Sequence, residues 1–149
     1  MKCAFTGHRI IKDYSLIKEK TKDQLIRLIE AGYTDFYNGG ALGFDAMSAL
    51  LVIELKKIYD ISLHLILPCK RHYGKWNEDQ KMTFNEIIFN ADTVEYASEE
   101  YSDDCMLLRN RMLCERCDLL LSHCTRPFGG SFYTVNYAKK LNKKIINIS

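Results

Sequence analysis

The sequence lacks several features that mark common classes of protein. No apolar run reaches the roughly 18 residues that a membrane-spanning helix needs. The 149 residues carry a formal net charge of only +2, which is too weak a bias for a dedicated nucleic-acid-binding protein. The start, MKCAFTGHR, turns polar too early for a secretory signal peptide, and no linker, repeat or low-complexity segment divides the chain. We therefore expect one domain over residues 1–149, cytoplasmic and without a membrane partner.

The six cysteines form neither a disulfide framework nor a metal-binding pattern. In a chain without a secretory leader they are expected to be reduced thiols. Cys114 and Cys117 have the Cys-x-x-Cys spacing, but they come late in an expected helix and no second such pair accompanies them. Core packing is the favoured interpretation of this pair, and we expect no metal and no cofactor.

Short β-rich runs alternate with longer helical runs along the whole chain. Hydrophobic residues make up 47% and charged residues 27%, as is typical of a globular protein. The expected strands are Cys3–Gly7, Asp35–Asn38, Ser62–Pro68, Thr93–Ala97, Asp118–Cys124 and Lys144–Ser149. The expected helices are Ser15–Ala31, Asp45–Tyr59, Asn77–Asn90, Asp103–Arg116 and Ser131–Leu141. This alternation predicts an α/β, three-layer Rossmann-like fold, with a mostly parallel sheet and helices on both faces.

Two glycine-rich loops lie where an expected strand meets an expected helix. They are NGGALGFDA, from Asn38 to Ala46, and RPFGGSFYT, from Arg126 to Thr134. Ligands of open parallel sheets bind beyond the carboxyl ends of the strands, and a helix N-terminus attracts anions. We interpret both loops as phosphate-binding, although such a loop can also be only a tight turn.

The loops match no standard nucleotide motif. A Walker Gly-Lys-Ser/Thr sequence is absent, which disfavours the chemistry of P-loop nucleotide hydrolases. The nearest match to the dinucleotide fingerprint follows the second strand instead of the first, and no carboxylate ends the next strand. Ordinary NAD binding is therefore a poor fit.

Single residues near these loops leave alternatives open. Asp45 is interpreted mainly as a helix cap, and binding of ribose hydroxyls is the less favoured interpretation. His8 is either a base or a polar ligand contact, and His64 is expected to be structural. The segment KRHYGKW (70–76) mixes cations and aromatic rings, as a nucleobase or nucleic-acid surface would, but a lid or a solvated loop would look the same.

Five motifs, in order and spacing, resemble one known family. They are TGHR, NGGALGFD, LPCKRHYGKW, RNRMLCERCDLLL and GGSFYTVNYAKKLNKKI. The chain is similar over essentially its whole length to the YpsA-like branch of the SLOG superfamily, which also holds DprA and the LOG nucleotide hydrolases. The resemblance implies a Rossmann-like fold with a site for a nucleotide or nucleotide derivative. The candidate ligand-binding residues are Gly7, His8, Arg9, Gly39, Gly40, Gly43, Asp45, Arg109, Asn110, Gly129, Gly130, Ser131 and Thr134.

One departure from the family bears on function. LOG hydrolases carry Pro-Gly-Gly-x-Gly-Thr-x-x-Glu with a catalytic glutamate, whereas this chain has PFGGSFYTVNYA, with Asn136 or Tyr137 near that position. The first hypothesis is therefore a sensor or carrier of a nucleotide-type small molecule, ADP-ribose-like ligands included. The alternatives are an enzyme that cleaves an N-glycosidic or phosphate bond, and a single-stranded nucleic-acid binder. The very apolar helix around MSALLVIEL (47–55) also predicts a homo-oligomer.

Overall fold

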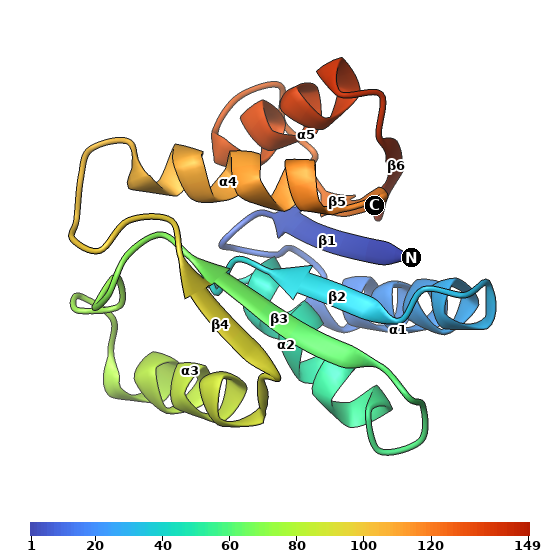
Figure 1. Ribbon diagram of the computed structural model, residues 1–149. Coiled ribbons are helices and arrows are strands. Elements are labelled where there is room, and N and C mark those ends of the chain that lie inside the picture. The colour runs from blue at the N-terminus through green and yellow to red at the C-terminus, as the bar shows by residue number, and fades with distance from the viewer.

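The computed structural model describes residues 1–149 and consists of strands and helices in strict alternation (Figure 1). The strands are β1 (Lys2–Gly7), β2 (Asp35–Asn38), β3 (Ser62–Leu67), β4 (Thr93–Tyr96), β5 (Leu119–His123) and β6 (Lys144–Asn147). The helices are α1 (Tyr14–Glu30), α2 (Phe44–Leu55), α3 (Glu78–Asn90), α4 (Cys105–Arg116) and α5 (Gly130–Lys140). Every expected element is present, so the periodicity of the sequence predicted them correctly.

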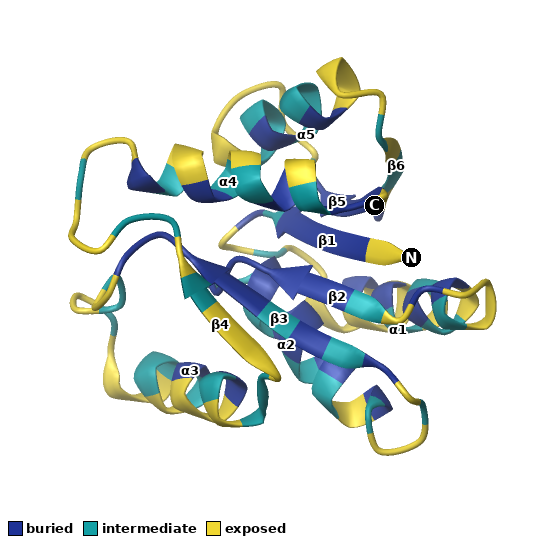
Figure 2. Cartoon of the chain, viewed as in Figure 1, coloured by how far each residue is buried: buried dark blue, intermediate teal, exposed yellow.

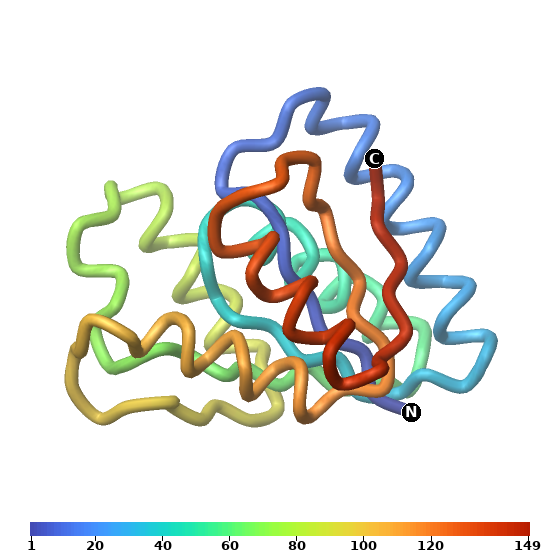
Figure 3. The backbone as a smooth tube through the Cα atoms, turned by 90° about the horizontal axis from the view of Figure 1, so that it is seen from above, coloured from blue at the N-terminus to red at the C-terminus, as the bar shows by residue number.

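The strands form one sheet in the order β4-β3-β2-β1-β5-β6, and every neighbouring pair is parallel. Helices α1, α2 and α3 cover one face, and α4 and α5 cover the other (Figures 1 and 3). The expected three-layer Rossmann-like fold is confirmed. From β1 the chain builds the sheet outward through β2, β3 and β4, and then returns to place β5 on the other side of β1. A crevice opens at such a switch point, at the carboxyl ends of the strands.

The core consists of two hydrophobic clusters, one on each side of the sheet (Figure 2). The larger has 22 buried residues and includes residues of α1, α2 and α3, whereas the smaller has 8 and includes residues of α4 and α5. Cys114 and Cys117 belong to the smaller cluster. Burial raises the pKa of Cys114 to about 12 and that of Cys117 to about 11, so both remain thiols at neutral pH. Their interpretation as core residues is confirmed.

Helix α2 is apolar almost all round because it is enclosed within this chain. It packs on β1, β2 and β3 and lies between α1 and α3. Met47, Leu51, Val52 and Leu55 are each at most 1% exposed. Its hydrophobicity is therefore explained by burial inside the domain and no longer argues for self-association. No helix in the structure combines the length and the apolar character needed to span a membrane.

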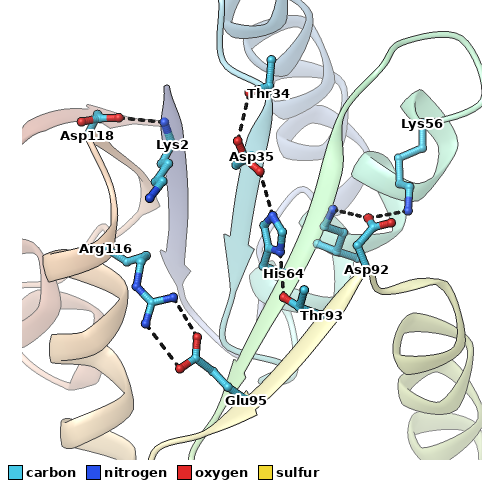
Figure 4. A network of polar contacts seen from close by, with 11 residues as sticks. Lys2, Thr34, Asp35, Lys56, His64, Asp92, Thr93, Glu95, Arg116 and Asp118 are labelled. Carbon is cyan, nitrogen blue, oxygen red and sulfur yellow. Dashed lines mark hydrogen bonds and ion pairs between the residues drawn. The ribbon is translucent and has the colours of Figure 1, made fainter.

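A polar network joins β2, β3 and β4 where the sheet face is not covered by a helix (Figure 4). The Nε2 atom of His64 lies 2.8 Å from Oδ1 of Asp35, and its Nδ1 atom lies 2.7 Å from the Thr93 hydroxyl. Nearby, Arg116 of α4 donates to Glu95 at 2.8 Å and 3.3 Å. His64 thus links three strands, which is the structural role expected for it.

Candidate functional site

A cleft of about 330 Å³ opens at the carboxyl end of β1, at the switch point of the sheet. It is bounded by the residues after β1, the first turn of α2, one side of α4 and the start of α5. Its charged lining residues are Arg9, Asp45, Arg109 and Arg126. Three cations against one carboxylate make the cleft suited to an anionic ligand.

His8 and Arg126 form one end of this cleft. The backbone N–H of Thr125 donates to Nε2 of His8 at 2.8 Å, and the Thr125 hydroxyl lies 3.1 Å from the same atom, so we assign the lone pair to Nε2. Burial and the neighbouring Arg126 lower the pKa of His8, which is therefore neutral and carries its proton on Nδ1. That Nδ1 lies 3.3 Å from Nη2 of Arg126, and a guanidinium can only donate. Two hydrogen-bond donors thus face each other without an acceptor between them.

The start of α5 completes this donor-rich end. The N-cap residue is Gly129, with φ 92°, and no side chain caps the helix. The first N–H groups of a helix have no acceptor inside it, and they carry its partial positive charge. A Cβ placed on Gly129 or Gly130 would meet nothing within 4 Å. This glycine loop is open, so an anion can reach the backbone.

The glycines after β1 and β2 are explained by packing within the chain. A Cβ on Gly40, whose φ is 68°, would overlap the side chain of Leu67, and one on Gly43 would overlap the backbone carbonyls of His8 and Arg9. A Cβ on Gly39 would lie 2.7 Å from Nη1 of Arg109. A Cβ on Gly7 would likewise lie 2.5 Å from Cβ and Cγ of Phe44.

Three N–H groups of the second-strand loop are also occupied. Gly40 donates to Oδ1 of Asn38 at 2.9 Å, and Ala41 donates to Oδ2 of Asp45 at 3.2 Å. The N–H of Phe44, at the start of α2, donates to the His8 carbonyl at 3.0 Å. The part of this loop around Gly40 is therefore filled by contacts within the chain and is not a free phosphate cradle.

Asp45 does not cap α2, contrary to the main expectation, because Gly43 is the N-cap residue and no side chain caps the helix. Its carboxylate instead lies in the cleft wall with one oxygen, Oδ1, buried and without a hydrogen-bond partner. Burial raises the pKa of Asp45 to about 6, although Arg109 and Arg9 act in the opposite direction. An acid whose pKa is raised toward neutrality, with an unused oxygen, is suited to hydrogen-bond a ligand hydroxyl.

Arg109 is buried beside Asp45 and holds two chain segments together. Its Nη1 donates to the Gly39 carbonyl, and its Nε donates to Oδ1 of Asn110 at 2.8 Å. Arg109 and Asn110 both line the cleft, as expected from the sequence. The neutral side chain of Asn110 positions the guanidinium without cancelling its charge.

The structure brings part of the expected set together. Eight of the expected residues line the cleft, namely Gly7, His8, Arg9, Asp45, Arg109, Asn110, Gly130 and Ser131. Gly39, Gly40, Gly43, Gly129 and Thr134 do not line it. The hydroxyl of Thr134 donates to the Gly130 carbonyl inside α5 at 2.8 Å. Arg126, whose guanidinium lies 5.2 Å from the centre of the Phe128 ring, was not expected, although it directly precedes the second glycine loop.

The all-parallel sheet with a switch point and a cationic cleft defines an open α/β protein of the Rossmann type. The sequence model of the YspA SLOG family matches residues 8–146. The chain therefore belongs to the YspA SLOG family, as the resemblance of its motifs implied.

Relatives and solved structures agree with this assignment. A UPF0398 protein of Halalkalibacterium halodurans is 30% identical over 129 residues, which cover 83% of this chain and 68% of that protein. One of Macrococcus caseolyticus is 36% identical over 84 residues, which cover 56% of this chain and 46% of that protein. This chain thus spans about half to two thirds of the length of these relatives.

Two DNA processing A proteins share the fold. That of Helicobacter pylori superposes with a TM-score of 0.75 at 22% identity, over 99% of this chain and 64% of the other. That of Streptococcus pneumoniae superposes with a TM-score of 0.69 at 14% identity, over 98% of this chain and 49% of the other.

Proposed function

We propose that the chain binds a nucleotide or a nucleotide-derived small molecule in the cleft between β1, α4 and α5. The phosphoryl group lies between His8 and Arg126, against the first turn of α5. The observation that carries this proposal is the pair of donors, His8 Nδ1–H and Arg126 Nη2, which lie 3.3 Å apart with no acceptor between them. A phosphate oxygen accepts from both at once and from the free N–H groups of the helix.

Asp45 supports an organic phosphate over inorganic phosphate. A carboxylate repels a phosphoryl group, so Asp45 serves a different part of the ligand. Its buried Oδ1 lacks a partner, and buried polar atoms are normally hydrogen-bonded. A ribose hydroxyl supplies the missing donor, which makes a nucleotide the simplest ligand with an anion and a hydroxyl together.

A sensor or carrier is the role proposed for this chain. Membership of the YspA SLOG family favours a nucleotide-type ligand, because the resemblance of the motifs implies such a site. The position near the catalytic glutamate of LOG hydrolases holds Asn136 and Tyr137, and neither supplies a carboxylate. Self-association of the chain also stays a prediction. The apolar character of α2 no longer supports it, because that helix is buried within the domain.

Single-stranded DNA is the second candidate ligand. The Helicobacter pylori protein with the same fold is described as having a unique single-stranded DNA binding mode. In this chain, the exposed cations Lys70, Arg71 and Lys75 lie in one loop with Trp76. Cations that contact the phosphate backbone and an aromatic ring on which a base stacks are typical of sites for single-stranded DNA.

Calorimetric titration with AMP, ADP, cyclic AMP and ADP-ribose tests the first proposal. We expect at least one of them to bind, and Arg126→Ala to weaken that binding by roughly 1.5–3 kcal/mol through loss of a charge-assisted hydrogen bond. Arg111→Ala is the matched control, because Arg111 is exposed and lies outside the cleft, against Tyr133. If no nucleotide binds while an oligonucleotide does, with affinity rising with its length, the second candidate replaces the first.

A further inference from the structure

We propose that the bound nucleotide carries a second phosphoryl group, separated from the first by the nucleoside, and that Lys70, Arg71 and Lys75 hold it. This inference rests on the proposed function and specifies its ligand class. The molecule that fits is a nucleoside 3′,5′-bisphosphate or a close analogue with anions at both ends.

A second and larger cavity adjoins the cleft. It has a volume of about 760 Å³ and shares Arg9, Ala41, Met106 and Arg109 with the cleft. Its lining includes five cations, which are those two arginines with Lys70, Arg71 and Lys75, and no aspartate or glutamate. A cavity with cations alone focuses positive potential and attracts an anion.

Arg9 connects the two cavities. It is exposed, lines both of them, and makes one hydrogen bond, to the Met106 thioether at 3.7 Å. A thioether is a weak acceptor, so most of the five guanidinium donors are free. A free guanidinium between two anion-attracting cavities is placed to bind a ligand that extends from one into the other.

The basic loop after β3 is anchored, so its cations are held near the cavity. His72 lies 3.2 Å from the Gly40 carbonyl through Nε2, and its ring packs against Trp76 and Phe84, with centroids 5.2 and 5.0 Å away. Its Nδ1 is buried and has no partner in the chain. The donation from Nε2 leaves the buried Nδ1 with a lone pair.

A nucleoside monophosphate uses only part of this surface. Its single phosphoryl group is satisfied by His8, Arg126 and α5, which leaves the cations of the larger cavity without a counter-charge. A pyrophosphate keeps its two anions adjacent, on one side of the ribose. Anions at the 5′ and 3′ positions, with the ribose near Asp45, match a cationic site on each side.

The test compares the affinities of AMP, ADP and adenosine 3′,5′-bisphosphate for the full chain by calorimetry. We expect the bisphosphate to bind at least about tenfold more tightly than AMP, and ADP to gain less. The triple variant Lys70→Gln, Arg71→Gln, Lys75→Gln is expected to reduce the ratio of bisphosphate to AMP affinity to about one. The control triple Lys18→Gln, Lys57→Gln, Lys139→Gln removes the same charge from exposed positions elsewhere and keeps the ratio.

The outcomes separate the two proposals. Absence of AMP binding to the wild-type chain overturns the proposed function itself. AMP binding with no preference for the bisphosphate, or a preference that survives in the triple variant, overturns only the second phosphoryl site. A short oligonucleotide that outcompetes the bisphosphate would assign the larger cavity to a nucleic-acid backbone instead.

Discussion

Gly40 lies against Leu67 so closely that any side chain at position 40 would overlap the leucine methyl group. The backbone at Gly40 also has φ 68°, a conformation that residues with a Cβ rarely adopt. The close contact with Leu67 and the positive φ are both requirements of the fold at Gly40. The second-strand loop is rich in glycine because β2, β3 and α4 converge on it.

We therefore expect Gly40→Val to destabilise the protein by roughly 2–4 kcal/mol, from overpacking and a strained backbone together. Gly74→Val is the matched control, because a Cβ there makes only an ordinary contact, 3.5 Å from the Arg71 carbonyl, and should change stability by less than about 0.5 kcal/mol. Urea unfolding of both variants measures the difference. Equal stabilities would mean that the loop can relax around a side chain.

Asp45 gives a prediction for the pH dependence of stability. Its pKa is raised from 3.8 to about 6, so the folded state binds this proton more tightly than the unfolded state does. Raising the pH through this interval removes the proton and lowers the contribution of Asp45 to stability. Asp45→Asn abolishes this titration. Between pH ~4 and ~7.5, the free energy of unfolding of the variant minus that of the wild type should therefore increase by on the order of 2–3 kcal/mol.

Urea unfolding of wild type and Asp45→Asn at both pH values checks this prediction, and the comparison cancels the other titrating groups. A constant difference between the two proteins across the interval would show that Asp45 titrates normally.

The chain is expected not to hydrolyse nucleoside monophosphates to free base. Asp45 is the one carboxylate that lines the cleft, and its Oδ2 accepts from the Ala41 N–H. On α5, the Tyr137 hydroxyl donates to Glu115 at 2.8 Å and both lie outside the cleft lining. Chromatography of AMP incubated with the protein should show no adenine above the enzyme-free rate. Release that survives repurification and disappears in Asp45→Asn would make Asp45 a catalytic acid.

Local patterns predicted the elements of the fold because their causes are local. The strand over Asp35–Asn38 has the expected bounds, and the helix expected from Asn77 begins there with a capping box in which Asn77 and Gln80 exchange hydrogen bonds. The position of the candidate cleft was predicted from the parallel sheet, since the loops that follow β1, β2 and β5 contribute to its lining.

The role of each glycine could not be predicted, because it depends on contacts between distant segments. The space around the glycines of the second-strand loop is filled by Arg109 of α4 and by the carbonyls of His8 and Arg9. No pattern within NGGALGFDA reveals these contacts. Arg126 was missed for the same reason, since its neighbour His8 is 118 residues away in the chain. Asp45 looked like a cap because it follows Gly43 closely, but the glycine takes the cap position.

Gly130 tests the central claim most directly, because a Cβ placed there meets no other segment of the chain within 4 Å and projects into the space that the ligand would occupy. We predict that Gly130→Val keeps the unfolding free energy of the wild type to within about 0.5 kcal/mol. In calorimetric titration, its affinity for the nucleotide that binds the wild type should fall at least about tenfold, because the valine excludes the phosphoryl group from the first turn of α5. A folded Gly130→Val protein that binds the nucleotide with unchanged affinity would contradict a phosphate site at this helix.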